Sequence, residues 1–226
     1  MHSTEDGAPV DLEQLVRRAW QIGQGIDLAG VGYGRKHWGN RTDISTWTPP
    51  YYHFLAGLAA LIEAKTAVEI GTHWGGSAVA ILRGMRARSP DAKIVTVDLT
   101  SESDNYLPKL PEAASIVKII GDANKLETIQ QVLTHSPSAD FLYIDAQHLA
   151  HPTLLNFTIY STLVRPKVAV FDDITWSDSM REFWRIVETA YANVCIDCRA
   201  VEPAIRSHPG FGLVAWPERL AQGRAA

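Results

Sequence analysis

The chain of 226 residues has little cysteine, no long apolar run and no surplus of positive charge. No stretch reaches the roughly eighteen consecutive apolar residues that a membrane span requires. Residues 1–7 are polar and lack the basic segment followed by an apolar one that marks a secretion signal. The formal net charge is -4, which argues against a nucleic-acid or membrane-surface partner. We therefore expect a soluble, cytoplasmic protein.

The only two cysteines, Cys195 and Cys198, have the C-x-x-C spacing of a redox pair or of half a zinc site. They lie in the apolar stretch Asn193–Arg199, which is predicted to be a strand. Residues three apart on a strand point to opposite faces. No second C-x-x-C and no paired histidines complete a set of four zinc ligands. We interpret both as ordinary strand cysteines.

Hydrophobic residues make up 46% of the chain, enough for a sizeable core. The length suits one α/β domain, residues 51–226, preceded by an extension, residues 1–50. Apolar residues recur at helical spacing from Asp11 to Ile22, which predicts a helix. Leu28–Pro50 is rich in Gly, Trp and charge and has no period, so it is either a lid over a cleft or a partly ordered arm.

From Tyr51 onward, helical and strand patterns alternate. Helices are expected at Phe54–Ala64, Ser77–Arg88, Ala123–Thr134, His148–Leu163 and from a cap at Ser177 or Asp178. Strands are expected at Ala67–Ile70, Ile94–Val97, Ser115–Ile120, Phe141–Ile144, Val168–Phe171, Val194–Cys198 and Gly212–Trp216. The pattern predicts a Rossmann-like, doubly wound, mostly parallel seven-stranded sheet with helices on both faces and an antiparallel C-terminal strand. Such sheets bind ligands beyond the carboxyl ends of their strands.

A glycine-rich turn, Glu69-Ile70-Gly71-Thr72-His73-Trp74-Gly75-Gly76-Ser77, joins the first strand to a helix. Glycines allow a sharp turn and a close approach by a ligand, and the helix start offers free N–H groups. His73 stands where the dinucleotide pattern G-x-G-x-x-G requires its second glycine. Together with the lack of a Tyr-x-x-x-Lys pair, this counts against a nicotinamide-dependent dehydrogenase, the alternative enzyme class on this sheet.

Acidic residues follow the next strands. Asp98 ends the second strand, where a carboxylate can accept both hydroxyls of a ribose. Asp122 and Ala123 follow the third, and Asp122 is either a pocket residue or a helix N-cap. Asp145 follows the fourth strand, and Asp172 and Asp173 follow the fifth. Carboxylates crowded at the edge of a core are costly unless a cation lies among them, and oxygen ligands suit Mg²⁺, Mn²⁺ or Ca²⁺.

The pattern E-x-G-x-x-x-G-x-S, with acids after the second and third strands, resembles class I S-adenosylmethionine-dependent methyltransferases. The resemblance covers roughly residues 66–187 and implies that S-adenosyl-L-methionine is the cofactor. The implied cofactor residues are Glu69, Gly71, Thr72, Gly75 and Ser77 for the methionine part, Asp98 for the ribose, Asp122 and Ala123 for the adenine, and Asp145 beside them.

The acids of the fourth and fifth strands resemble those of metal-dependent O-methyltransferases, both the catechol type and the type acting on macrolide sugars. The resemblance implies that Asp145, Asp172 and Asp173 hold a divalent cation such as Mg²⁺. His148, three residues after Asp145, matches the general base of the macrolide-sugar type. The Asp172-Asp173 pair departs from the acid–amide pair of catechol enzymes, and no catechol-type lysine is evident near Asp145.

These features predict an O-methyltransferase acting on a hydroxyl of a small molecule, either a sugar-containing or a phenolic natural product. A homodimer is possible, and neither nucleic acid nor membrane is expected as a partner. Several alternatives stay open at this point. The acids of the fifth strand can persist without a metal, with Asp173 as a helix cap, and His148 can be bonded to backbone. The chain could also be a catalytically inactive, nucleoside-binding partner subunit.

Overall fold

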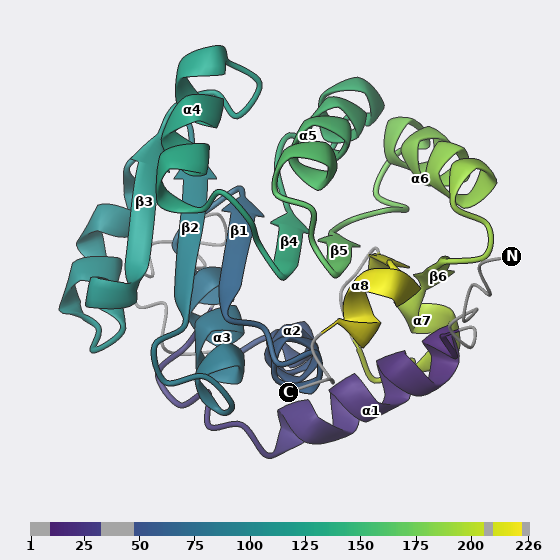
Figure 1. The fold of residues 1–226 in the computed structure, drawn as a ribbon, viewed down its shortest axis with the longest axis horizontal. Helices are drawn as coiled ribbons and strands as arrows, with labels where there is room; N and C mark the ends of the chain where they lie inside the picture. Colours follow the sequence, from purple (N-terminus) through teal and green to yellow (C-terminus); the bar gives the residue numbers. More distant parts are fainter. Residues whose placement is uncertain (1–9, 33–47, 206–209, 223–226) are drawn as a thin grey trace, which may run out of the picture.

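The computed structural model describes residues 10–32, 48–205 and 210–222, and these form a seven-stranded sheet flanked by helices (Figure 1). The strands are β1 (Thr66–Ile70), β2 (Lys93–Asp98), β3 (Ile116–Ile120), β4 (Phe141–Ile144), β5 (Val168–Phe171), β6 (Cys195–Asp197) and β7 (Gly212–Ala215). Their order across the sheet is β3-β2-β1-β4-β5-β7-β6. Neighbours among β1 to β5 are parallel, and β7 runs antiparallel to β5 and β6. The predicted sheet is thus confirmed.

Helices cover both faces of the sheet, as Figure 1 shows, with α4, α5 and α6 on one face and α1, α2 and α3 on the other. Their bounds are α1 Leu12–Gln24, α2 Pro50–Leu61, α3 Gly76–Arg86, α4 Leu126–His135, α5 Ala150–Leu163, α6 Asp178–Ala190, α7 Cys198–Val201 and α8 Pro217–Ala221. Three short 3₁₀ helices lie between β2 and β3, at Glu102–Asn105, Leu107–Lys109 and Ala113–Ser115. None of the helices in the described ranges has the length and apolar character to cross a membrane.

Alternating side chains of the central strands belong to two separate hydrophobic cores, one on each face of the sheet. In β4, Phe141 and Tyr143 pack with α1, α2 and α3, whereas Leu142 and Ile144 pack with α5 and α6. All four are at most 1% exposed, as expected of a parallel strand covered on both sides. α1 joins the first core through Val16 and Ala19, and it packs mainly on α2.

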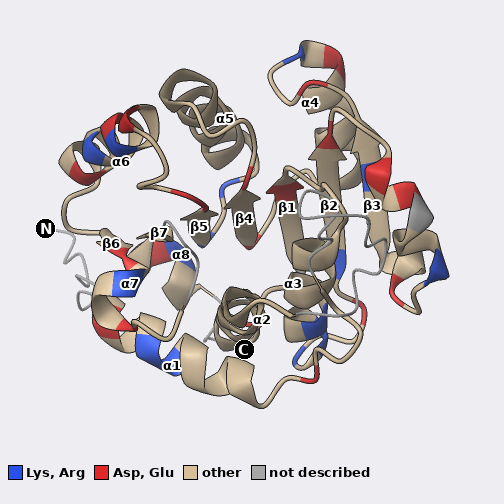
Figure 2. Cartoon of the chain, turned by 180° about the vertical axis from the view of Figure 1, so that it is seen from behind, with Lys and Arg blue, Asp and Glu red and all other residues tan. Residues whose placement is uncertain are grey.

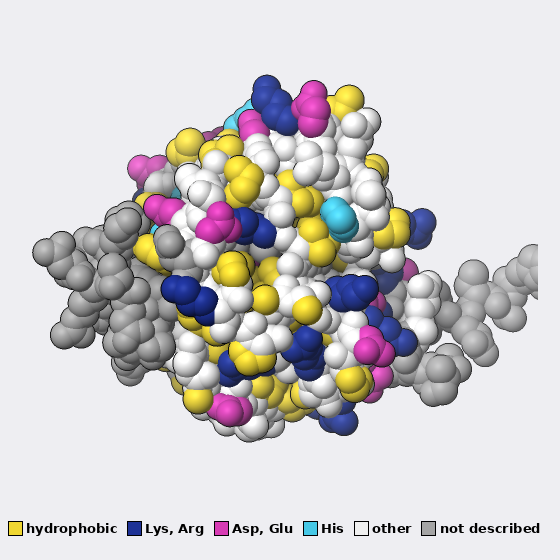
Figure 3. Space-filling model, turned by 90° about the vertical axis from the view of Figure 1, so that its left-hand side faces the viewer, with side chains coloured by type: hydrophobic (Ala, Val, Ile, Leu, Met, Phe, Trp, Pro, Cys, Tyr) yellow, Lys and Arg dark blue, Asp and Glu magenta, His cyan; other side chains and the backbone are white. Residues whose placement is uncertain are grey.

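The edge strand β3 is the least covered of the parallel strands. Ile120 at its end is 48% exposed, and Lys118 pairs with Asp104 of the preceding 3₁₀ turn. Figure 3 shows the face on this side of the molecule, where basic, acidic and apolar side chains are interspersed. A charged side chain on an edge strand is a common protection against pairing with another chain.

Three helix starts differ by two or more residues from the sequence-based expectation, and one of them is α4, which begins at Leu126 rather than Ala123. α2 begins at Pro50 rather than Phe54, because a helix buried on almost every side shows no amphipathic period at its first turn. α5 begins at Ala150 rather than His148. Gln147 and His148 both have positive φ, at 59° and 45°, so they form a left-handed turn before the helix.

The interpretation of the two cysteines is wrong in one respect. Cys195 lies in β6, but Cys198 is the first residue of α7 and is not on the strand. Both are free thiols, and Cys198 is buried. Burial raises the pKa of both thiols, which disfavours the thiolate that redox or metal chemistry needs.

Candidate active site

A cavity of about 300 Å³ opens at the carboxyl ends of β1 to β4, the edge at which a sheet of this topology binds ligands. Figure 2 shows acidic residues at the tips of β1 and β2 and in the segments that leave β4 and β5. The lining comes from Tyr52, residues 70–77, residues 97–99, residues 121–124, residues 145–148 and Asn156. The sequence-predicted residues Gly71, Thr72, Gly75, Ser77, Asp98, Asp122, Ala123, Asp145 and His148 are all among them.

The turn after β1 requires glycine at two positions. Gly71 has φ +103°, and a Cβ there would lie 1.9 Å from the carbonyl oxygen of Asp145. Gly75 has φ +85°, and it is the residue from which α3 departs. Most other residues would strain the backbone at these angles. The resulting tight turn brings the start of α3, with its unpaired N–H groups, to the wall of the cavity.

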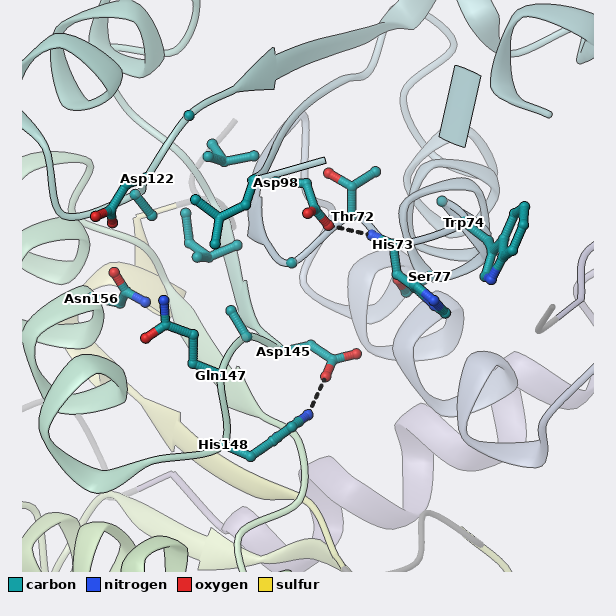
Figure 4. A pocket seen from close by; sticks show the side chains of 18 of the residues that line it. Thr72, His73, Trp74, Ser77, Asp98, Asp122, Asp145, Gln147, His148 and Asn156 are labelled. Atoms are coloured by element: carbon teal, nitrogen blue, oxygen red, sulfur yellow. Dashed lines mark hydrogen bonds and ion pairs between the residues drawn. The ribbon is translucent and has the colours of Figure 1, made fainter. Parts of the chain in front are cut away.

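Asp98 is held in place at the end of β2. Its Oδ2 accepts a hydrogen bond of 2.6 Å from the backbone N–H of His73, and its Oδ1 accepts one of 3.0 Å from that of Thr100. Figure 4 shows the contact with His73 at the cavity wall. Oδ1 also accepts a bond of 3.2 Å from the Thr100 hydroxyl. A carboxylate oxygen has two lone pairs, so Oδ2 keeps one for a ligand hydroxyl, such as that of a ribose.

Glu69 is fully buried behind the glycine turn and is not among the residues that line the cavity. Its Oε1 accepts a hydrogen bond of 2.6 Å from the Ser77 hydroxyl, and its Oε2 accepts one from the Thr96 hydroxyl. The hydroxyls of Thr96 and Thr72 are also bonded, at 2.5 Å. Burial raises the pKa of Glu69 to about 7, against the opposing effect of its two hydroxyl partners. Glu69 therefore supports the turn from behind.

The far end of the cavity is lined by amide and carboxylate side chains. Asp122 accepts a hydrogen bond of 2.9 Å from the backbone N–H of Asn124. It does not cap α4, which begins at Leu126 with Lys125 as its N-cap, so the capping alternative for Asp122 is wrong. Asn156 of α5 also lines this end and is 2% exposed. The sequence analysis missed Asn156, whose one signal was an amide within an apolar helical stretch.

The opposite end holds Asp145 and His148, in the turn between β4 and α5 (Figure 4). The Nε2 of His148 lies 3.6 Å from Oδ1 of Asp145, and its Nδ1 lies 3.7 Å from Oδ2 of Asp173. These separations are within ion-pair range but longer than a hydrogen bond. The left-handed turn, rather than a helix start, places the imidazole between the acids of two neighbouring strands.

The acids beside His148 hold protons more tightly than ordinary carboxyls. Burial raises the pKa of Asp145 to about 7, repulsion from Asp173 and Glu69 adds to this, and a hydrogen bond from the Tyr143 hydroxyl opposes it. Burial and repulsion from Asp172 likewise raise the pKa of Asp173 to about 7, while His148 lowers it. Perturbed pairs of this kind are typical of functional sites.

Not all predicted residues come together. Asp172 is 9% exposed and Asp173 is partly buried, but neither lines the cavity. Within the described residues, no group of three or more His, Cys, Asp or Glu side chains is arranged to hold a metal ion. Ser177, not Asp173, caps α6. Most of the predicted lid, residues 33–47, lies outside the described residues.

Comparison with known proteins agrees with this geometry. Residues 68–174 match the family model described as a methyltransferase domain. No curated protein matches the chain. An O-methyltransferase from Bacillus cereus in complex with SAH is similar in structure, with 19% identity, a TM-score of 0.59 and coverage of 92% of this chain and 93% of that chain. The O-methyltransferase TomG from Streptomyces achromogenes in complex with SAM has 20% identity, a TM-score of 0.55 and coverage of 89% of each chain. A putative O-methyltransferase from Klebsiella pneumoniae has 20% identity, a TM-score of 0.59 and coverage of 92% of this chain and 91% of that chain.

The structural matches show the fold, since the identities are low, and the family match covers the segment from β1 to the end of β5. The segment that matches the family model includes the glycine turn and the strand-end acids Asp98, Asp122, Asp145, Asp172 and Asp173. Residues 68–174 match the model of a methyltransferase domain, and the chain shares its fold with solved O-methyltransferases in complex with SAH and with SAM.

Proposed function

We propose that the chain transfers the methyl group of S-adenosyl-L-methionine to a hydroxyl of a small sugar-containing or phenolic molecule, with the help of a divalent cation. The observation that carries the proposal is the imidazole of His148, which lies 3.6 Å from Asp145 and 3.7 Å from Asp173 at the cavity. A proton acceptor at this point is what an oxygen nucleophile requires. The nicotinamide-dehydrogenase alternative is dropped because the family match is to methyltransferases.

The cavity offers a separate group for each part of the cofactor. The turn of residues 71–77 and the start of α3 suit the methionine part, because free N–H groups bind a carboxylate. The fixed carboxylate of Asp98 suits the ribose hydroxyls. Residues 121–124, which include Asp122 and Ala123, suit the adenine. Glu69 acts on the cofactor through Ser77 and Thr96 rather than by touching it.

Methyl transfer from a sulfonium is an in-line displacement in which the cofactor supplies the leaving group. The protein must therefore place the acceptor oxygen and take its proton. Neutral His148 can take that proton at the ring nitrogen that carries no hydrogen. The imidazolium that forms has a carboxyl group within ion-pair range of each nitrogen, from Asp145 and from Asp173. Two such partners stabilise the charged form and so favour proton transfer.

The acidic cluster also suits a hard cation by its donor chemistry. Asp145, Asp172 and Asp173 present only carboxylate oxygens, the ligands that Mg²⁺, Mn²⁺ and Ca²⁺ prefer. Burial, and then repulsion from neighbouring acids, raises the pKa of Asp145 and Asp173, and a cation among them would relieve the repulsion. When bound, the ion would lower the pKa of the acceptor hydroxyl and orient its oxygen. The three acids would hold it only after their side chains had moved closer together, since no such group in the described residues is arranged for a metal ion.

The direct test is transfer of a labelled methyl group to a panel of phenolic and sugar-bearing compounds, each paired with its methyl ether or deoxy analogue. We expect label in a compound with a free hydroxyl and none in its blocked partner. If no compound is methylated, calorimetry with S-adenosylhomocysteine shows whether the chain still binds the cofactor product. Binding without transfer to any acceptor favours the inactive partner subunit, and a lack of binding removes the proposed function altogether.

A further inference from the structure

The carboxylate of Asp145 lies between a tyrosine of the core and the imidazole of His148. The hydroxyl of Tyr143, on β4, donates a hydrogen bond of 3.2 Å to Oδ2 of Asp145. The other oxygen of the same carboxylate, Oδ1, is the one that lies 3.6 Å from Nε2 of His148 (Figure 4). The two oxygens of Asp145 therefore face two different side chains, and only one of these, His148, lines the cavity.

The ring of Tyr143 is firmly held. It is fully buried in the first core and lies parallel to the ring of Phe211, with 6.1 Å between the ring centroids and an angle of 4° between the planes. Phe211 in turn contacts the rings of Tyr51 and Phe54 on α2. A ring packed in this way has little freedom to change rotamer. Its hydroxyl is therefore a donor at a fixed point beneath the cavity.

The other partners of Asp145 are less able to fix its orientation. Asp172 also hydrogen-bonds to Asp145, but a carboxyl group can donate only while it is protonated. The contact with His148 is longer than a hydrogen bond. A tyrosine hydroxyl carries its proton at neutral pH, so Tyr143 remains a donor whether or not the acids are ionised.

We propose that Tyr143 is a positioning residue for methyl transfer, whose hydroxyl holds the Asp145 carboxylate in the rotamer that presents Oδ1 to His148. The inference rests on the proposed function, because it takes His148 as the group that accepts the proton. Tyr143 does not line the cavity, so it acts through Asp145 and not on the acceptor itself. Without the hydroxyl, the carboxylate would be free to turn, and His148 would lose a fixed partner. Misalignment of this kind lowers the rate of the chemical step.

The direct test compares crystal structures of the wild-type chain and Tyr143→Phe. The variant keeps the ring and its stacking on Phe211, so it should fold, which its thermal unfolding checks. We expect a single rotamer of Asp145 in the wild type, and a different rotamer or more than one in the variant. An Asp145 side chain that superposes on that of the wild type would overturn the proposal. This measurement needs no acceptor, so its result does not depend on the proposed function.

Kinetics provide the second test. Tyr143→Phe should lower kcat about tenfold, while the dissociation constant of S-adenosylhomocysteine stays near the wild-type value. In a chain that already carries His148→Ala, it should have no further effect, because the hydroxyl acts through the partner of His148. Tyr191→Phe is the matched control and should keep the wild-type kcat, since Tyr191 packs on Phe157 and Trp216 and does not line the cavity.

The outcomes separate the two proposals. An unchanged kcat in Tyr143→Phe, or the same fold-loss with and without His148→Ala, would overturn the positioning role and leave the proposed function standing. If His148→Ala alone keeps the wild-type kcat, the general base of the proposed function has failed, whatever the effect of Tyr143→Phe.

Discussion

Nε2 of His148 lies 3.6 Å from Oδ1 of Asp145, although His148 precedes α5 by two residues and has a left-handed backbone. The turn, not the helix, sets the direction of the imidazole. His148 therefore depends on residues 145–149 for its position and is not carried by helix geometry. A left-handed conformation in a non-glycine residue costs free energy, and such strain is often found at functional sites.

Replacing His148 by Ala should lower kcat by about 10²- to 10⁴-fold, because this is the usual contribution of a general base. The dissociation constant for S-adenosylhomocysteine should stay near the wild-type value. Steady-state kinetics on the identified acceptor give kcat, and calorimetry gives the dissociation constant. His151→Ala is the matched control, since His151 is an exposed histidine in the first turn of α5, three residues after His148. A His148→Ala variant that keeps most of the wild-type kcat would rule out His148 as the general base.

Removal of divalent cations by EDTA should abolish turnover, and added Mg²⁺ or Mn²⁺ should restore it. Asp173→Asn should raise the Mg²⁺ concentration needed for half-maximal activity, because it removes one charged ligand. Asp178→Asn, at an exposed acid on α6, should not. Full activity in chelator, with no metal found by elemental analysis, would take the cation out of the mechanism and leave the imidazole to act alone.

Asp98→Ala should weaken cofactor binding by roughly ten- to hundredfold, because hydrogen bonds to a charged group are lost. The same substitution removes the bond from the His73 N–H, so part of the loss comes from a looser glycine turn. Asp91→Ala is a suitable control at an exposed acid before β2. Calorimetry showing the same affinity in both variants would contradict a ribose-binding role.

Glu69 should make the folded state less stable as the pH rises. Its pKa is raised from 4.5 to about 7, so the folded state binds a proton that the unfolded state has released. Its contribution is fully present below about pH 4.5 and is lost as the pH rises through about 7. The shift corresponds to a loss of on the order of 3 kcal/mol.

The measurement is the free energy of unfolding in urea at pH 5 and pH 8. The wild type should lose more stability between these values than Glu69→Gln does, because glutamine carries no titrating proton. Most other titrating acids contribute equally to both chains, whereas the pKa of Asp145 should also fall in Glu69→Gln, because repulsion from Glu69 helps to raise it. Glu63→Gln, at an exposed position, should follow the wild type. An equal loss of unfolding free energy between pH 5 and pH 8 in the wild type and in Glu69→Gln would show that Glu69 does not titrate in this range.

The sheet and the glycine turn were predictable because their signals are local. Buried parallel strands are short apolar runs, and Gly71 and Gly75 occupy backbone angles that other residues avoid. Asp98 and Asp145 followed from the rule that ligands bind beyond strand ends. These residues could be assigned without knowing any long-range contact.

Other features depend on contacts that one sequence does not reveal. Asn156 lines the cavity only because α5 lies beside the segment after β3. The left-handed turn at His148 interrupts a pattern that continues smoothly into α5. Glu69 carries a motif typical of cofactor contact, yet the hydroxyls of Ser77 and Thr96 take both of its oxygens.

The close approach of Gly71 to Asp145 has a consequence for the order of events. The backbone N–H of Asp145 donates to the carbonyl of Ile70, and no room remains for a side chain on Gly71. The glycine turn and the turn that carries His148 thus touch through their backbones while lining one cavity. A displacement of Gly71 when a cofactor enters would therefore displace Asp145, the acid beside His148, as well.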